Sequence, residues 1–308
     1  MKGNWTTNNI PDLTGKVIIV TGGNSGLGFW SVKAFAGKGA RVVLASRSTE
    51  RGEKAKAEIP KGTPEGNVEV AELNLADLES VHRFATTFLQ RHNRLDVLLN
   101  NAGIMTTPWF TTKDGFEGQL GTNHLGHFAL TGWLLPVLQE TPGSRVVNVS
   151  SMAHRQGKMD FSNLLFENGK GYSPMKAYSR SKLANLLFSY ELQRFFETRQ
   201  TGSKAVAAHP GVSQTELFRH LDDKWYFRMV RPLFKAISQD GEMGALPQIR
   251  ASVDPEVQGG EFYGPSGFNE LKGSPVKVKS NGASHHPEDA RKLWEVSGKL
   301  TGVKYLMD

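Results

Sequence analysis

Short apolar runs rich in β-branched residues alternate with segments of helical period along most of the chain, and this alternation restricts the fold more than any other feature. Strands of this composition are typical of parallel sheets that are buried on both faces. The pattern predicts an α/β fold, a Rossmann-type doubly wound parallel sheet in three α/β/α layers. The expected strands span residues 16–21, 41–46, 68–73, 95–100, 145–150 and 204–209. The expected helices span residues 26–38, 49–58, 77–92, 117–139, 174–199 and 287–299.

The chain is long enough for one large domain. It has 308 residues, of which 38% are hydrophobic and 22% charged, and can enclose a sizeable core. No repeat and no linker rich in Pro, Gly or Ser divides it, so we expect a single domain over residues 1–308. Two irregular stretches after Gly211, residues 212–235 and 265–286, are expected to form loops on the substrate side. Within the first, residues 224–234 could be a lid, a membrane-touching patch or an ordinary packed helix.

The composition excludes several kinds of chemistry and partner. Cysteine is absent, which excludes disulfides, thiolate catalysis and cysteine metal sites. The net charge of +7 is scattered along the chain, which favours a polyanionic small ligand over nucleic acid, for which no basic recognition helix is present. Residues 1–10 contain no apolar signal-peptide core, and no segment reaches about 20 apolar residues. We therefore expect a cytoplasmic protein without a transmembrane segment, and peripheral membrane contact is left open.

The sequence TGGNSGLG, residues 21–28, stands between the first expected strand and the first expected helix. Glycines in this position let the backbone turn tightly and approach a pyrophosphate, while the helix start offers free N–H groups and a positive dipole end. A plain structural turn is the alternative. The position between strand and helix favours a dinucleotide site, for which the expected binding residues are Gly22, Asn24, Ser25, Gly26, Leu27 and Gly28.

The second expected strand ends in ASRS, so Ser46 and Arg47 follow it and no carboxylate occurs before Glu50. An acidic residue there would repel the 2′-phosphate of NADP, whereas Arg47 can pair with it. NADP(H) is therefore favoured over NAD(H), although Arg47 could also be a solvated loop charge. The fourth expected strand ends in NNAG, which alone is a strand followed by a turn. The residues there that can pack along a cofactor are Asn101, Ala102 and Gly103.

Six short motifs occur in an order and approximate spacing that resemble the short-chain dehydrogenases/reductases. They are TGGNSGLG, NNAG, NHLGHF (123–128), VVNVSS (146–151), YSRSK (178–182) and HPG (209–211). The resemblance extends from about residue 15 to residue 300. Within the family, NHLGHFALTGWLLP, SSMAH and SKLANLLFSYEL are most similar to the branch that contains retinol dehydrogenases and light-dependent protochlorophyllide reductases. The resemblance implies an oxidoreductase that uses a nicotinamide cofactor.

The family's active-site residues, carried over by motif, fall on Asn123, Ser151, Tyr178 and Lys182. Ser151 is the second serine of its pair, and the residues between it and Tyr178 are expected to form a loop over the substrate side. The resemblance also implies that Lys182 binds the nicotinamide ribose and that Asn123 shapes a water-linked proton path. Asn74 stands where the family often has an aspartate facing the adenine. The remaining cofactor-binding residues that the resemblance implies are Asn74, Leu75, Pro210, Gly211, Val212 and Thr215, together with Tyr178 and Lys182.

Tyr178 and Lys182 also have a physical reason to be paired. Residues i and i+4 share a helix face. A neighbouring ammonium stabilises a phenolate, so Lys182 is expected to lower the pKa of Tyr178 below its usual value of about 10. Tyr178 would then serve as general acid in ketone reduction or general base in alcohol oxidation, while Ser151 bonds the substrate oxygen. An exposed pair without catalytic role is the alternative.

The sequence therefore predicts an NADP(H)-dependent oxidoreductase that interconverts a carbonyl and an alcohol on a small, fairly apolar substrate. A non-catalytic NADP(H)-binding regulator is one alternative, disfavoured because Tyr178 and Lys182 are both present. A reductase of a pigment-like double bond is another, disfavoured by the absence of cysteine. No metal site is expected, because His124 and His127 fall on packing positions of the family pattern. The protein could be a monomer or a homodimer.

Overall fold

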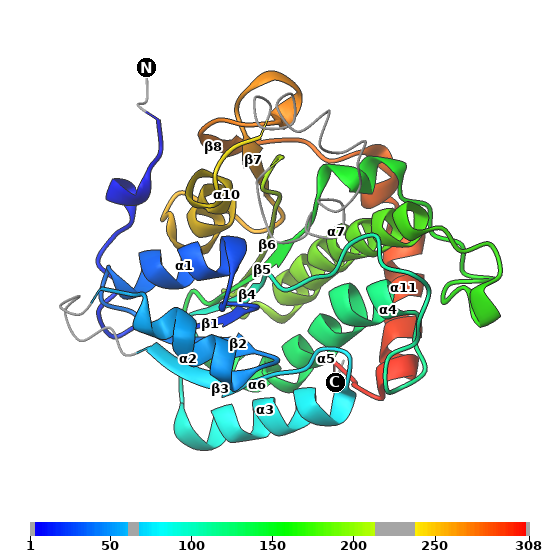
Figure 1. The fold of residues 1–308 in the computed structure, drawn as a ribbon, viewed down its shortest axis with the longest axis horizontal. Coiled ribbons are helices and arrows are strands. Elements are labelled where there is room, and N and C mark those ends of the chain that lie inside the picture. Colours follow the sequence, from blue (N-terminus) through cyan, green and yellow to red (C-terminus); the bar gives the residue numbers. More distant parts are fainter. Residues whose placement is uncertain (1–3, 61–67, 213–237, 306–308) are drawn as a thin grey trace.

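A single eight-stranded sheet forms the middle layer of the protein (Figure 1). The structure is a computed structural model and describes residues 4–60, 68–212 and 238–305. The strands follow the order β3-β2-β1-β4-β5-β6-β7-β8 across the sheet. They are β1 (Val17–Thr21), β2 (Arg41–Ser46), β3 (Val68–Glu72), β4 (Val97–Asn100), β5 (Arg145–Val149), β6 (Lys204–Ala208), β7 (Phe262–Pro265) and β8 (Pro275–Lys277). The predicted Rossmann-type architecture is confirmed.

The order of the strands reverses at β1. From β1 the chain builds outward to β2 and β3, and it then crosses to β4 on the other side of β1. Ile18 of β1 accordingly pairs in parallel with Val42 of β2 and with Val97 of β4. Parallel pairing continues to β7, and only β8 is antiparallel to its neighbour. Ligands in open α/β sheets bind at such a reversal, beyond the carboxyl ends of the strands.

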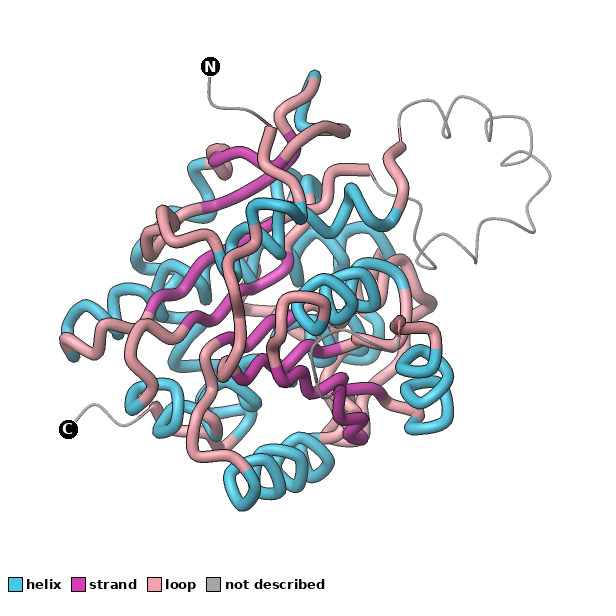
Figure 2. Tube along the Cα trace, turned by 90° about the vertical axis from the view of Figure 1, so that its left-hand side faces the viewer, coloured by secondary structure: helices cyan, strands magenta, loops and turns pink. Residues whose placement is uncertain are grey.

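Helices cover both faces of the sheet, as the tube in Figure 2 shows. The helices on one face are α1 (Gly26–Ala36), α2 (Thr49–Ala57) and α10 (Gly241–Val253). Those on the other face are α3 (Leu78–Arg91), α5 (Gly126–Trp133), α6 (Leu135–Glu140) and α7 (Pro174–Arg199), with α11 (Pro287–Thr301) packed on α7. This arrangement gives the three layers that the sequence predicts.

Two apolar clusters, one on each face of the sheet, hold the layers together. Side chains alternate across a strand, so Ile18 and Val20 join the cluster under α1 and α10, whereas Ile19 joins the cluster under α3 and α5. All three side chains are 0% exposed. Burial of one such side chain contributes about 1.5–3 kcal/mol to stability. The core thus fixes the strands whose ends carry the site.

Four elements differ from the sequence prediction. β3 is an edge strand in which only Val68 is buried, so the expectation of a strand buried on both faces is wrong for residues 68–73. The helix α10 and the short strands β7 and β8 are not among the predicted elements. β8 lies within residues 265–286, so this stretch is not simply a loop.

The helix predicted over residues 117–139 is divided into four pieces. A short α4 (Gly118–Leu120) leads into a π-helical turn, η2 (Gly121–Leu125), before α5 begins. The chain then breaks at Leu134, just before Pro136, and continues as α6. Proline suits the first turn of a helix but not its interior, which explains the break. π-helical turns are frequent at functional sites, and this one contains Asn123.

Part of the predicted substrate side lies outside the described residues. This part is residues 213–235, which include Thr215 and the stretch 224–234. None of the helices in the described ranges combines the length and apolar character needed to cross a bilayer. A cytoplasmic location stays a prediction of the sequence.

Candidate active site

Most of the candidate cofactor-binding residues, together with Ser151, follow the carboxyl ends of parallel strands. Because these ends meet at one edge of the sheet, residues far apart in the chain are brought to the same side. Gly22 to Gly28 follow β1, Arg47 follows Ser46 at the end of β2, and Asn101 to Gly103 follow β4. Ser151 comes two residues after the last residue of β5, and Pro210 to Val212 come after β6.

The glycine loop after β1 has a backbone that only glycine suits. Gly22 and Gly26 have φ angles of +66° and +53°, a region that other residues rarely adopt. A Cβ on Gly28 would fall 2.2 Å from the carbonyl oxygen of Gly22. Ser25 precedes α1 without capping it by its side chain, so the first N–H groups of α1 are open to an anion. Leu27 is buried and anchors the helix start in the core.

The end of β2 carries an arginine and no carboxylate. The Ser46 hydroxyl donates to Asn24 Oδ1 at 3.0 Å, which ties the glycine loop to β2. Arg47 is exposed and pairs with no acidic side chain among the described residues. Asn74 Oδ1 accepts the N–H of Ala76 at 3.2 Å, so the Asn74 amide shapes its own turn. Leu75, next to it, is 7% exposed.

The segment after β4 connects the glycine loop with the catalytic candidates. Asn101 Nδ2 donates to the carbonyl of Thr21 at 2.8 Å. A Cβ on Gly22 would lie 3.0 Å from Ala102 Cβ, and one on Gly103 would lie 3.5 Å from Lys182 Nζ. The loop, the NNAG segment and Lys182 therefore form an unbroken line of contacts. A cofactor bound at the loop can reach the catalytic candidates along this line.

Asn123 is buried in the π-helical turn and its amide is fully engaged. Its Nδ2 donates to the carbonyl of Ile104 and to the Ser181 hydroxyl, both at 2.9 Å, and its Oδ1 accepts the N–H of Ile104 at 2.8 Å. These bonds fix the segment after the NNAG motif against α7. Asn123 therefore lies beside Gly103, with its Oδ1 3.2 Å from where a Gly103 Cβ would be.

His127 joins this turn to β1. Its Nδ1 donates to the carbonyl of Asn123 at 3.0 Å, so its Nε2 accepts from the Thr21 hydroxyl at 2.9 Å. Thr21 Oγ1 in turn accepts the N–H groups of Asn101 and Ala102 at 2.9 and 3.0 Å. Complete burial lowers the pKa of His127 to about 4, so the ring is neutral near pH 7. This neutral network joins the ends of β1 and β4 to the π-helical turn.

Tyr178 and Lys182 lie on the same side of α7, as their spacing predicts. Lys182 Nζ is 5.7 Å from the centre of the Tyr178 ring and donates to the carbonyl of Val149 at 3.0 Å. Both side chains are buried, with Tyr178 6% and Lys182 4% exposed. An exposed surface pair is thereby ruled out. The Ser151 side chain lies close enough to the Tyr178 phenol to act on its pKa as a hydrogen-bond partner.

The predicted effect of Lys182 on the Tyr178 pKa is wrong for this structure. Burial raises the pKa of the Tyr178 phenol, and the hydrogen bond with Ser151 opposes this rise only in part. Lys182 is not among the groups that shift it. Burial also lowers the pKa of Lys182 to about 8, because a buried ammonium loses hydration. Burial of both groups, which their spacing in the sequence does not reveal, decides the direction of both pKa shifts.

Ser151 caps a short 3₁₀ helix, η3 (Met152–Gln156), by accepting the N–H of Ala153 at 3.2 Å. The carbonyl of Ser151 accepts from His154 Nδ1 at 2.6 Å, and His154 Nε2 accepts the N–H of Asn281 at 3.4 Å. Burial lowers the pKa of His154 to about 4. A neutral histidine thus fixes the backbone of Ser151 to the C-terminal part of the chain.

The segment after β6 is held by the loop between β7 and β8. Val212 N–H donates to the carbonyl of Leu271 at 2.8 Å. Gln239 Nε2 donates to the carbonyl of Pro210 at 2.8 Å, and Gln239 Oε1 accepts the N–H of Gly273 at 3.0 Å. Gly211 has a φ of +66°. Residues 266–273, within the predicted 265–286 stretch, therefore rest on the predicted cofactor segment.

Sequence reasoning missed several residues of this edge. His127 counted only as a packing position, and no role was given to His154, Gln239 or Glu270. His127 lies four residues after Asn123, a spacing that could have indicated their contact. No local pattern indicates the others, because their partners are distant in the chain.

His124 Nε2 contacts the Ser297 hydroxyl at 2.9 Å, and the described ranges hold no group of three or more His, Cys, Asp or Glu that could bind a metal.

The sheet, its glycine loop and the buried residues at its carboxyl edge define a nucleotide-binding oxidoreductase of Rossmann type. Residues 16–164 match the family described as short chain dehydrogenase. Human retinol dehydrogenase 11 is 40% identical over 291 residues, covering 94% of this chain and 87% of the relative. Mouse retinol dehydrogenase 12 is 39% identical, covering 98% of this chain and 91% of the relative. The chain belongs to the short-chain dehydrogenase family, in its retinol-dehydrogenase-like branch.

Solved structures agree with this assignment. The crystal structure of an uncharacterised protein from Mycobacterium paratuberculosis is 38% identical, with a TM-score of 0.82 over 99% of this chain and all of its own length. The Pseudomonas aeruginosa RhlG/NADP active-site complex shares the fold at 21% identity, with a TM-score of 0.63 over 82% of this chain and 94% of that one. The protein is therefore an oxidoreductase that acts on CH–OH or C=O groups with NAD(P).

Proposed function

We propose that the protein is an NADP(H)-preferring oxidoreductase of small, fairly apolar carbonyl compounds and alcohols, with Tyr178 as the general acid and base. The observation that carries the proposal is the continuous contact from the glycine loop through Gly103 to Lys182 and Tyr178. This contact supports a cofactor position in which the pyrophosphate lies on the loop and the nicotinamide lies beside the phenol.

The preference for NADP(H) rests on the end of β2. The adenosine half of a cofactor on the glycine loop extends toward β2 and β3, where Arg47 is exposed and unpaired among the described residues. A guanidinium in this place pairs with a 2′-phosphate by charge-assisted hydrogen bonds. Gly28 lets the start of α1 pack directly against the glycine loop, because a Cβ there would fall 2.2 Å from the Gly22 carbonyl oxygen.

The catalytic step needs a proton at the substrate oxygen. When bound, the reduced nicotinamide supplies a hydride to the carbonyl carbon. The raised pKa keeps Tyr178 protonated near pH 7, so the phenol is ready to donate its proton to the oxygen on which negative charge develops. Ser151, whose side chain lowers the pKa of the phenol, then stabilises the phenolate that remains.

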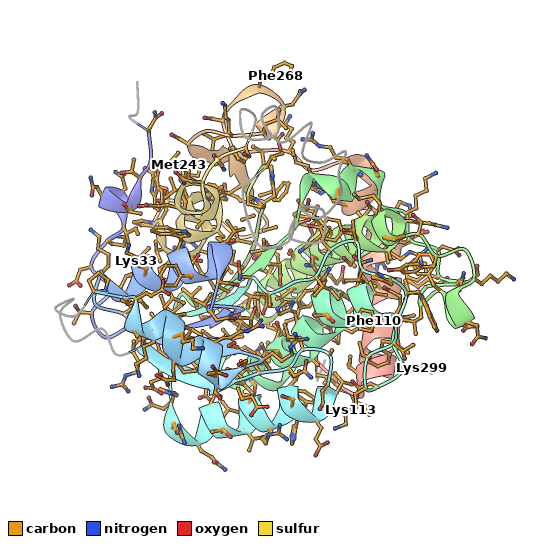
Figure 3. All side chains as sticks on the ribbon, viewed as in Figure 1. Lys33, Phe110, Lys113, Met243, Phe268 and Lys299 are labelled. Atoms are coloured by element: carbon orange, nitrogen blue, oxygen red, sulfur yellow. The ribbon has the colours of Figure 1, made fainter. Side chains whose placement is uncertain are left out.

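An apolar substrate suits the residues around the start of α7. Trp109, Phe110 and Met175 are 41%, 39% and 45% exposed. Trp109 packs beside Gly169, and Phe110 lies next to α4 (Figure 3). Tyr172 donates to the carbonyl of Thr107 at 2.8 Å, which holds these two segments together. The curated relatives are named for retinol, an apolar alcohol.

Replacement of Tyr178 by phenylalanine tests the proposal. Loss of the proton donor is expected to lower kcat by about 10²- to 10⁴-fold and to leave the Kd for NADPH within about 3-fold, a factor worth less than about 1 kcal/mol. The measurement is nicotinamide absorbance with a panel of aldehydes, ketones and alcohols and with both cofactors. Tyr190→Phe removes another buried phenol from α7, one that bonds Ser280, and is expected to keep kcat.

The same panel separates the proposal from its alternatives. Full activity of Tyr178→Phe would exclude the acid–base role. Tight NADPH binding without turnover of any compound would favour a nucleotide-binding regulator, and turnover only of conjugated double bonds would favour a pigment reductase.

A further inference from the structure

His209, the first residue after β6, has a tautomer that its partners determine. Its imidazole is fully buried. The N–H of Gly211 donates to Nδ1 at 3.2 Å, so Nδ1 carries the lone pair and Nε2 carries the proton. Nε2 then donates to Glu270 Oε2 at 2.8 Å. Burial lowers the pKa of His209, so the neutral ring is the stable form near pH 7.

Glu270 reaches this histidine from an unusual backbone position. Its φ is +59° and that of Asn269 is +49°, and such angles are costly for residues other than glycine. The loop also carries Phe268 at its tip, 83% exposed (Figure 3), so apolar burial of that side chain does not hold the loop down. The Glu270 carboxylate is 21% exposed, and its bonds are the evident compensation for the strained backbone.

The second oxygen of Glu270 binds the neighbouring part of the edge. Arg155 Nη2 lies 2.9 Å from Glu270 Oε1, and Arg155 belongs to η3, the short helix that Ser151 caps. The space for the His209 ring comes from Gly264 of β7, where a Cβ would fall 2.1 Å from Nε2. One carboxylate therefore connects the segment after β5 with the segment after β6.

We propose that Glu270 is a positioning residue for the nicotinamide end of the cofactor site. Its carboxylate selects the Nε2–H tautomer of His209, and Nδ1 then holds the N–H of Gly211 and the turn of residues 209–212. The other oxygen of Glu270 binds Arg155. It therefore holds η3, and with it Ser151, at a fixed position relative to that turn. The inference rests on the proposed function, because it needs a cofactor that extends from the glycine loop past β4 toward β5 and β6.

The test uses two variants of Glu270 and one matched control. Glu270→Ala removes both contacts, whereas Glu270→Gln keeps an oxygen that can accept the His209 Nε2–H. Glu261→Gln is the control, because this carboxylate also pairs with a basic side chain, that of Lys277 in β8, but it precedes β7 and so lies at the opposite end of that strand from Glu270. The readouts are the ¹⁵N NMR signals of the His209 ring, assigned with His209→Gln, and the Kd values for NADPH and for 2′,5′-ADP.

The positioning role predicts that the two ligands respond differently. Glu270→Ala should give His209 a mixture of tautomers and raise the Kd for NADPH about 5- to 30-fold, as expected for lost hydrogen bonds to a charged group. The Kd for 2′,5′-ADP, which lacks the nicotinamide, should change less than about 2-fold, under about 0.5 kcal/mol. Glu270→Gln should restore most of the NADPH affinity, and Glu261→Gln should match the wild type.

Two outcomes would overturn the inference. One is an Nε2–H tautomer and an NADPH affinity that both persist in Glu270→Ala. The other is equal weakening of NADPH and 2′,5′-ADP, which would indicate a general loss of stability. Failure of the proposed function would instead appear in the wild type as absence of turnover, while the tautomer of His209 would still report on Glu270.

Discussion

The two halves of the catalytic edge are built in different ways. The half after β1, β2 and β4 is shaped by its backbone. Gly22 and Gly26 have positive φ angles, and the backbone approaches Gly28 too closely for any Cβ. The half after β5 and β6 is held by side chains from the C-terminal region, where Asn281 bonds His154 and Glu270 bonds His209.

The difference teaches where specificity can vary without loss of the fold. The glycine loop of the first half depends on its own backbone conformation, so one substitution there damages cofactor binding directly. The second half depends on partners 61 and 127 positions away, so a change in the C-terminal region can alter the substrate side while the glycine loop stays intact.

Gly28→Ala should show the largest effect, because it breaks the first half. The new Cβ would meet a backbone atom, the Gly22 carbonyl oxygen at 2.2 Å, which cannot rotate away as a side chain could. We expect a loss of about 1–3 kcal/mol in unfolding free energy from overpacking and at least about 100-fold weaker NADPH binding, or about 3 kcal/mol. Urea unfolding and fluorescence titration measure the two quantities.

Gly282→Ala provides the control for that experiment. A Cβ on Gly282 meets nothing within 4 Å, so both stability and NADPH affinity should stay near the wild-type values. An NADPH affinity in Gly28→Ala equal to that of Gly282→Ala would contradict the account of the loop.

The same contrast explains how much of the fold the sequence could predict. Strands β1, β2 and β4 to β6 and helices α1 and α7 have long, locally consistent patterns, and the structure confirms them. Three-residue β8 is too short to show a period. α10 contains Pro247 in its interior, and proline is a signal against helix. The break at Leu134 follows from Pro136, a local signal that the prediction of one helix over residues 117–139 left out, whereas no local pattern indicates the π-helical turn.

For the candidate site, the sequence could indicate residue types but not their electrostatic state. The spacing of Tyr178 and Lys182 predicted a shared helix face, and the structure places them so. It could not indicate that Lys182 is 4% exposed, and the burial of both groups decides the direction of the pKa shifts. The contacts of Glu270 and His154 were equally hidden, because they join segments that only the folded sheet brings together.

Arg47→Asp should show a smaller effect, confined to the adenosine end of the first half. Loss of a charge-assisted contact and gain of repulsion should lower the preference for NADPH over NADH by about 10- to 100-fold. The ratio of kcat/KM values with the two cofactors measures it. Arg51→Asp makes the same charge change one turn into α2 and should leave the preference nearly unchanged. An unaltered ratio in Arg47→Asp would remove this residue from the 2′-phosphate site.

The smallest effect expected is a pH dependence of stability. It comes from His154 in the second half and from His127, which bonds Thr21 of β1. Burial lowers the pKa of His127 and of His154 to about 4, below the value of about 6.5 for an unfolded chain. Below about pH 6.5 the unfolded chain therefore binds protons that the folded protein does not, so stability falls as the pH falls toward 4. Each group contributes up to about 1.4 kcal/mol per pH unit in this window.

His154→Gln should remove one such contribution, so its urea-unfolding free energy should fall less steeply between about pH 6.5 and about pH 5 than that of the wild type. Equal slopes would mean that His154 takes up its proton in the folded protein and that the fixed carbonyl of Ser151 does not depend on a neutral ring.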